Sequence, residues 1–218
     1  FNLNKKSYSV LPIIKEMLQK NILRRGGSIH FGGGEPTLLP EFDDIIRLLL
    51  DYKFYDLRVH TSGIKYSPIL ERGIREGRLR VIVSVDAGCA ETFQKIKQVP
   101  AYDIVRENIR KYAAAQVLRK HALTPDLYMK GGICASTKFI VIPGLNDTKE
   151  EVENWIKADV EAGVNTSIID IEENWFKAHE DNLPQSIFDF IHLIQDLTQK
   201  YGTHFELYKR VANMLKDN

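Results

Sequence analysis

Short aliphatic and β-branched runs alternate along the chain with longer segments in which apolar residues recur every three or four positions. The short runs predict strands, and the longer segments predict helices that bury one face. Six strands are expected, over residues 28–31, 56–60, 79–85, 137–142, 165–171 and 204–208. Their alternation with helices predicts an α/β fold with a parallel sheet, either doubly wound or curled into a full or partial barrel.

Turn and capping residues support this order. Gly77 and Gly163 stand where two helices are expected to end, and Thr148 with Glu151 has the spacing of a capping box. The first helix is expected over residues 9–23, with no strand before it. We therefore expect one domain, residues 1–218, that lacks a first strand and the loop after it.

The charge balance narrows the classes of partner. The chain has 30 Lys and Arg against 29 Asp and Glu, a formal charge of +1, which gives no field that would draw it to nucleic acid or an anionic membrane. The basic run at residues 72–80 has no interleaved aromatic residues and is interpreted as a solvated helix face and turn. No apolar run is long enough to cross a bilayer, and the N-terminus lacks a signal-peptide core. A cytoplasmic location is expected.

Neither cysteine nor histidine spacing indicates a metal site. The two cysteines, Cys89 and Cys134, stand alone and are interpreted as ordinary reduced thiols. His30, inside a predicted strand, is expected to be a packed core residue. His60, at a strand end, is the better candidate for a pocket residue.

Polar residues follow the predicted strands, at the edge of the sheet where parallel strands place their functional groups. Gly32, Gly33 and Gly34 would let a ligand approach the backbone closely, and Glu35 adds a carboxylate suited to an ammonium group. This turn has neither the spacing of a P-loop nor that of a dinucleotide fingerprint.

Later strand ends add further polar groups. Ser84 and Asp86, two positions apart on one predicted strand, are expected to share a face, where a carboxylate could accept hydrogen bonds from sugar hydroxyls. Lys138 would be costly to bury without an anionic partner, although it could also lie exposed at the strand end.

Three segments resemble, in matching order and spacing, the radical S-adenosylmethionine (SAM) superfamily. Gly-Gly-Gly-Glu-Pro-Thr at residues 32–37 resembles its GGEP segment, and residues 83–96 look like its fourth-strand segment. Residues 138–148 are similar to the fifth-strand segment of pyruvate formate-lyase activating enzymes and their relatives. The resemblance spans about residues 9–171 and implies a partial (β/α) barrel of parallel strands.

The resemblance also implies a SAM site. The amino group would be held by Gly33, Gly34 and Glu35 beside Pro36, the ribose by Ser84 and Asp86, and the methionyl carboxylate by Lys138. Thr61 and Ser62 would line the same pocket. The adenine would lie near Ile142, Pro143, Gly144 and Leu145.

The superfamily binds a [4Fe-4S] cluster through a C-x3-C-x2-C loop that this sequence lacks, so the ligands are expected upstream of Phe1. The resemblance implies that the intact protein is an oxidoreductase or activating enzyme. It would take electrons from an external donor and cleave SAM to a 5′-deoxyadenosyl radical. This fragment alone is expected to be inactive. Peptide, sugar and small-metabolite substrates stay open.

Two other functions remain possible from the sequence. One is a SAM-binding module without a cluster. The other is an ordinary barrel lyase or hydrolase that uses Asp86, Glu172 and His60 as acid–base groups. The polar loop after the fifth strand could face substrate or be a solvated connection with capping residues. It contains Asp170, Glu172, Glu173, Asn174 and Trp175.

Overall fold

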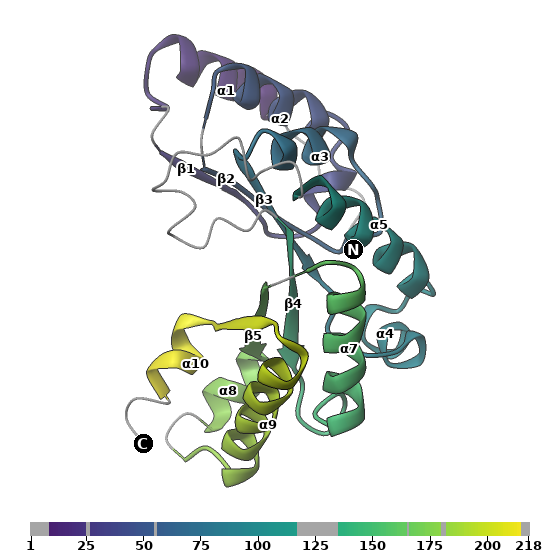
Figure 1. Cartoon of the computed structure of the whole chain (residues 1–218). Helices are drawn as coiled ribbons and strands as arrows, with labels where there is room; N and C mark the ends of the chain where they lie inside the picture. The colour runs from purple at the N-terminus through teal and green to yellow at the C-terminus, as the bar shows by residue number, and fades with distance from the viewer. Residues whose placement is uncertain are drawn as a thin grey trace.

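The computed structural model describes residues 9–24, 27–54, 56–116, 135–164, 166–179 and 182–214, which contain one six-stranded sheet (Figure 1). All neighbouring strands are parallel, and they lie in the order in which they occur in the sequence. The strands are β1 (Ser28–Phe31), β2 (Asp56–Thr61), β3 (Leu79–Ser84), β4 (Ala135–Val141), β5 (Thr166–Ile171) and β6 (His204–Leu207).

Helices connect the strands and cover the sheet (Figure 1). They are α1 (Leu11–Gln19), the short 3-10 helix η1 (Pro36–Leu38), α2 (Phe42–Asp51), α3 (Pro68–Arg75), α4 (Ala90–Lys97), α5 (Tyr102–Ala115), α7 (Lys149–Glu161), α8 (Glu173–His179), α9 (Gln185–Tyr201) and α10 (Lys209–Met214).

The strand order decides between the two architectures that the sequence leaves open. A doubly wound sheet reverses its strand order at a switch point, whereas here each strand pairs with the next one along the chain. Because crossovers between parallel strands are right-handed, an unreversed order places the connecting helices on one face of the sheet. The expected partial (β/α) barrel with parallel strands is confirmed.

Side chains alternate between the two faces of the sheet. The helix-covered face is apolar and buried, as at Leu57, Val59, Val81 and Phe139, which are fully inaccessible to solvent. Phe139 packs against Trp155 of α7, with ring centroids 4.8 Å apart. These contacts build the hydrophobic core between sheet and helices.

The opposite face, here called the inner face, is mostly polar. Arg80 of β3 reaches Glu206 of β6 at 3.4 Å, although two strands separate them in the sheet. A contact of this kind requires the sheet to curve, as in a barrel. By register, the inner face carries Ser28, His30, Asp56, Arg58, His60, Arg80, Ile82, Ser84, Ser136, Lys138, Ile140, Thr166, Ile168, Asp170, His204 and Glu206.

The predicted strands are confirmed in number and order, with ends that differ by one or two residues; Asn165 lies outside the described residues. The first helix is shorter than residues 9–23. It has a proline at its first turn and gives way to Asn21, which has a positive φ of 54°. A left-handed residue of this type ends a helix.

The predicted helix ends are confirmed at Gly77 and Gly163, which have positive φ angles of 68° and 80°. The capping box is only half formed. Thr148 caps α7 by accepting a hydrogen bond from the backbone N–H of Glu151. The Glu151 carboxylate instead accepts one from the backbone N–H of Gly88 at 2.6 Å, and so joins α7 to the loop after β3.

Candidate functional site

The loop after β1 exposes bare backbone. Gly33 and Gly34 have φ angles of 82° and 104°, which only glycine adopts without strain. A Cβ atom built at either position would meet nothing within 4 Å. Open space therefore lies directly over the main chain at the carboxyl end of the sheet, as the sequence predicts.

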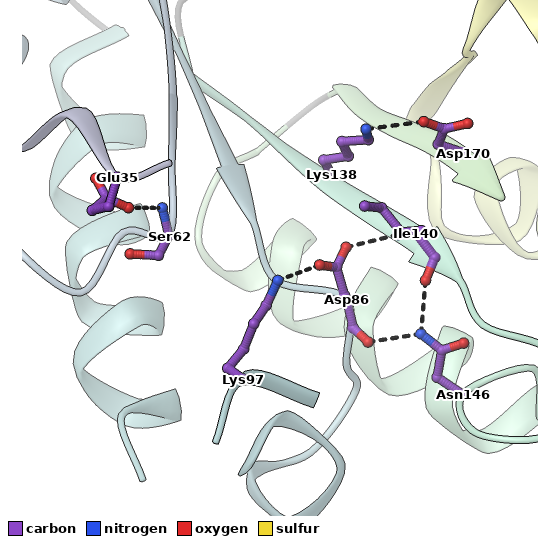
Figure 2. A network of polar contacts seen from close by, with 8 residues as sticks. All are labelled: Glu35, Ser62, Asp86, Lys97, Lys138, Ile140, Asn146 and Asp170. Atoms are coloured by element: carbon purple, nitrogen blue, oxygen red, sulfur yellow. Dashed lines mark hydrogen bonds and ion pairs between the residues drawn. The ribbon is translucent and has the colours of Figure 1, made fainter. Parts of the chain in front are cut away.

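Glu35 turns its carboxylate toward its own chain (Figure 2). One oxygen accepts hydrogen bonds from the hydroxyls of Thr37, at 2.6 Å, and Thr61, at 2.7 Å. The other accepts the backbone N–H of Ser62 at 2.5 Å. Glu35 also caps η1, which begins at Pro36. It therefore fastens the glycine loop to the end of β2.

Burial acts to raise the pKa of Glu35, but the hydrogen bonds from Ser62, Thr37 and Thr61 together outweigh it and leave the pKa below its usual value. The group is thus ionised at neutral pH and places a negative charge beside the open glycines. Thr61 is only 3 % exposed, and its hydroxyl is bonded to Glu35. Ser62 is half-buried.

Ser84 and Asp86 do not continue one alternating face, contrary to the sequence prediction. The strand ends at Ser84, and both Val85 and Asp86 direct their N–H groups to the carbonyl of Lys138, at 3.0 and 3.4 Å. This bulge-like irregularity, with a φ of 58° at Asp86, re-aims the aspartate. Ser84 stays half-buried on the inner face.

Asp86 is 2 % exposed, and its carboxylate is occupied by the chain (Figure 2). It accepts the backbone N–H of Ile140 at 2.7 Å and forms an ion pair with Lys97 of α4. Because both contacts engage its carboxylate, Asp86 does not present an exposed hydrogen-bond acceptor to a ligand. The residue instead joins the end of β3 to β4 and α4.

Asn146 completes this junction and was missed by sequence reasoning. Its amide donates to the backbone carbonyls of Asp86 and Ile140, both at 2.8 Å, and its oxygen accepts the N–H of Ile142 at 2.7 Å. The side chain is fully buried. An asparagine just after a Pro-Gly turn is the signal that could have indicated a side chain bonding back to the backbone.

The turn that Asn146 holds is the predicted adenine-binding segment. The N–H of Leu145 bonds to the carbonyl of Ile142 at 3.0 Å, Gly144 has a φ of 82°, and Pro143 lies between them. Leu145 is 39 % exposed and Ile142 is half-buried. The turn thus presents apolar side chains beside the end of β4.

Lys138 has an anionic partner that the sequence did not identify. Its Nζ lies 3.0 Å from Asp170 of β5 and 4.8 Å from the ring centre of Tyr208 (Figure 2 shows the ion pair). The side chains of Lys138 and Asp170 are 13 % and 3 % exposed. Asp170 therefore differs from the other acidic residues near the end of β5, because it lies on the inner face of the sheet.

The rest of that loop forms a helix cap. Glu172 accepts the backbone N–H of Trp175 at 2.7 Å and the side-chain amide of Asn174 at 3.2 Å. The backbone hydrogen bond from Trp175, followed by that from Asn174, lowers the pKa of Glu172. Glu173 pairs with Lys177 on the surface of α8. The capping interpretation explains these residues.

His30 is exposed on the inner face, so the prediction of a core histidine is wrong. The next strand carries His60 on the same face, half-buried. Burial lowers the pKa of His60, and the positive charges of Lys138, His30, Arg80 and Arg58 lower it further. Cys89 caps α4. Cys134 lies outside the described residues.

Within the described residues, no group of three or more His, Cys, Asp and Glu side chains could hold a metal ion. The same part of the chain contains no helix of the length and hydropathy needed to cross a membrane. The strand ends combine open glycine backbone, a serine hydroxyl and an apolar turn. They also carry the carboxylates of Glu35 and Asp86, which are hydrogen-bonded to the protein's own backbone.

Comparison with known proteins identifies the family of this chain. The model of the Radical SAM superfamily matches residues 6–158. A "Probable GTP 3',8-cyclase" of Saccharolobus islandicus is 35% identical over 83 residues, which cover 38% of this chain and 27% of that protein. A "GTP 3',8-cyclase" of Aliarcobacter butzleri is 34% identical over 84 residues, which cover 38% and 26%. The matches span about a quarter of these relatives' length.

Solved structures share the fold. A domain of pyruvate-formate lyase-activating enzyme from Bacteroides vulgatus superposes with a TM-score of 0.57 at 16% identity, covering 84% of this chain and 99% of that one. A radical SAM methyltransferase from Sphaerobacter thermophilus gives a TM-score of 0.55 at 15% identity, covering 91% and 56%.

Proposed function

From the premise that the chain belongs to the radical SAM superfamily, we propose that it forms the SAM-binding barrel of an enzyme that cleaves SAM reductively. The open backbone of Gly33 and Gly34 at the carboxyl end of the sheet is the observation that carries the proposal. Exposed main-chain carbonyls there suit the ammonium of the methionyl group, and the ionised Glu35 beside them adds a favourable charge.

Other groups at the strand ends suit the remaining parts of SAM. The Ser84 hydroxyl can bond a ribose hydroxyl, while Ile142 and Leu145 offer apolar contact to adenine. Lys138 has three N–H donors and uses one toward Asp170, so it can also bind the methionyl carboxylate. In this proposal, Asp86 is a positioning residue, because its carboxylate fixes the backbone around Ser84 and Ile140.

The superfamily generally uses a [4Fe-4S] cluster, which supplies the electron that breaks SAM into methionine and a 5′-deoxyadenosyl radical. The 218 residues contain two cysteines, which cannot provide a three-cysteine ligand set. We therefore assign no cluster ligand in this chain. In this proposal its residues bind and orient SAM at the strand ends.

The substrate and the class of overall reaction are left unassigned. The relatives include proteins named as cyclases and a methyltransferase, so oxidoreductase or activating-enzyme chemistry has no special support. A lyase or hydrolase built on Asp86, Glu172 and His60 is disfavoured. The first carboxylate is buried in bonds to the chain, and the second caps α8.

Calorimetric titration of SAM into the chain tests the binding step. Gly34→Ala should weaken binding about tenfold or more. It places a methyl group over the open backbone of Gly33 and Gly34, here called the glycine cradle, and it strains a positive-φ backbone. Gly202→Ala is the matched control, since Gly202 also has a positive φ, of 66°, with open space around it, but ends α9. Equal affinities in the two variants would contradict the assignment of the cradle.

The cleavage step requires the complete protein with its cluster. Under anaerobic conditions, SAM and a strong reductant should yield 5′-deoxyadenosine, and Gly34→Ala should lower the yield. A protein that binds SAM and carries its cluster but forms no 5′-deoxyadenosine would instead be a SAM-binding module.

A further inference from the structure

Basic side chains form a row across the inner face of β1, β2 and β3. His30 is the register partner of Arg58, and Arg58 is the register partner of Arg80. Register partners in neighbouring strands project from the same face. The three side chains, here called the basic row, therefore lie side by side on the inner face.

Like charges placed directly opposite each other in a sheet are destabilising unless they are compensated. Two carboxylates compensate the basic row in part. Arg58 forms a bidentate contact with Asp56, with both N–O distances 3.0 Å, and Arg80 reaches Glu206 at 3.4 Å. Among the described residues, the Nε of Arg80 has no hydrogen-bond partner, although it is buried.

The acidic groups of the inner face lie mainly on the opposite side of the barrel. Asp170 and Glu206 are on β5 and β6, whereas β1–β3 carry one acidic residue on this face, Asp56. Lys138 of β4 pairs with Asp170. The wall made by β1–β3 thus carries more basic than acidic side chains. Burial is the main cause of the lowered pKa of His60, the next inner-face residue after Arg58 on β2, and the neighbouring positive charges lower it further.

The basic row lies deeper in the barrel than the proposed SAM site at the strand ends. Strands rise about 3.3 Å per residue, so Arg58 lies about 7 Å below His60 and further still from the glycine cradle. The side chains of Arg58 and Arg80 are 39 % and 19 % exposed, so a ligand can reach both. A substrate that meets SAM at the strand ends could extend an anionic group down to this wall.

We propose that Arg58 and Arg80, with His30 and His60 beside them, bind a phosphate group of the substrate. Two guanidinium groups on neighbouring strands offer planar, forked donors that match phosphate oxygens. The proposal deepens the proposed function and rests on it, because the substrate it describes is the one that the SAM-derived radical would attack.

Titration of inorganic pyrophosphate into the chain tests the site without any catalytic step. Arg80→Gln and Arg58→Gln should each weaken binding about tenfold, and Arg80→Lys less. Arg47→Gln is the matched control, because it removes the same charge from the exposed surface of α2. Pyrophosphate at about 100 times its Kd should raise the Tm of the wild-type chain by about 5 °C, a rise that Arg80→Gln should roughly halve at the same concentration.

Two results would overturn the site. One is pyrophosphate binding that is absent, or that Arg47→Gln weakens as much as Arg80→Gln does. The other is tighter binding of a tricarboxylate than of pyrophosphate, which would replace phosphate with a carboxylate ligand. SAM affinity measured on the same variants separates this outcome from failure of the proposed function, since neither arginine belongs to the glycine cradle.

Discussion

The carboxylate of Glu35 lies where the glycine loop meets the end of β2 and accepts hydrogen bonds from Thr37, Thr61 and Ser62. These bonds favour its charged form over the protonated form. An ionised carboxylate held in this way keeps the cradle in one geometry before any ligand binds. Lys65 adds to the junction by donating to the carbonyl of Thr37 at 2.8 Å.

The lowered pKa makes a prediction for stability against pH. A carboxyl whose pKa is lower in the folded than in the unfolded state stabilises the fold above its unfolded pKa, about 4.5 here, and loses that effect as pH falls through the folded value. Urea unfolding of wild type and Glu35→Gln should therefore show a difference at pH 7 that shrinks below about pH 4.5. A constant difference down to pH 2 would contradict a charge effect.

The candidate site could be predicted from the sequence as a set of residue types, but only partly as a set of contacts. The glycines lie open at the end of β1, and Ser84 is half-buried on the inner face. The sequence does not specify that the Asp86 carboxylate turns to bond Ile140 and Lys97, since this depends on two N–H groups sharing the carbonyl of Lys138. Likewise, Arg80 was grouped with a surface run, whereas strand alternation directs it to the inner face.

At the scale of elements, the period of apolar residues was sufficient to predict the strands and their alternation with helices along the chain, but it left the strand order within the sheet open. The period of apolar residues does not predict which elements are joined by hydrogen bonds between polar groups. Glu151 illustrates this limit, because a local capping box and a tertiary contact require the same side chain. The tertiary contact, with Gly88, is the one that forms.

The close approach of α7 to the loop after β3 predicts a large effect of one methyl group. A Cβ atom at Gly88 would lie 2.0 Å from the backbone oxygen of Glu151, so Gly88→Ala should destabilise the protein by about 3 kcal/mol. Gly32→Ala serves as the control, because a Cβ there meets nothing within 4 Å. Denaturant titrations that give equal stabilities for the two variants would show that the loop and α7 separate easily.

For the molecule as a whole, a buried ion pair joins the helix layer to the sheet. Arg106 of α5 and Asp159 of α7 are 2.8 Å apart and almost inaccessible, and Asp159 also accepts hydrogen bonds from the hydroxyls of Thr137 and Ser167. Burial raises the pKa of Asp159 despite the adjacent guanidinium. The pair therefore specifies how the layers dock more than it adds to stability.

This view predicts a non-additive pair of substitutions. Arg106→Met alone should cost about 3–5 kcal/mol, since it leaves a buried carboxylate without its cation. Adding Asp159→Leu should restore stability to within about 1 kcal/mol of wild type, because Thr137 and Ser167 can still bond each other, at 3.3 Å.

An exposed ion pair on the same helix provides the control for this cycle. Arg110 and Glu107 are 3.1 Å apart and half exposed, so Arg110→Met should change stability by less than about 1 kcal/mol. Chemical denaturation of the wild type and the three variants measures both effects. A double variant as unstable as Arg106→Met would show that the ion pair itself supplies stability.

The ladder between β3 and β4 has a consequence for the order of folding. Val81 pairs with Ala135, which closes more than twice the length of chain that the pairing of Leu57 with Leu79 closes. The longer connection costs only about 0.8 kcal/mol more to close, but pairings distant in sequence form more slowly than local ones. We therefore expect the first three strands and the last three to form before the two units pair. The contacts of Asp86, Glu151 and Arg106 all bridge the two units, so they form only when the units join, in the step that creates the binding surface.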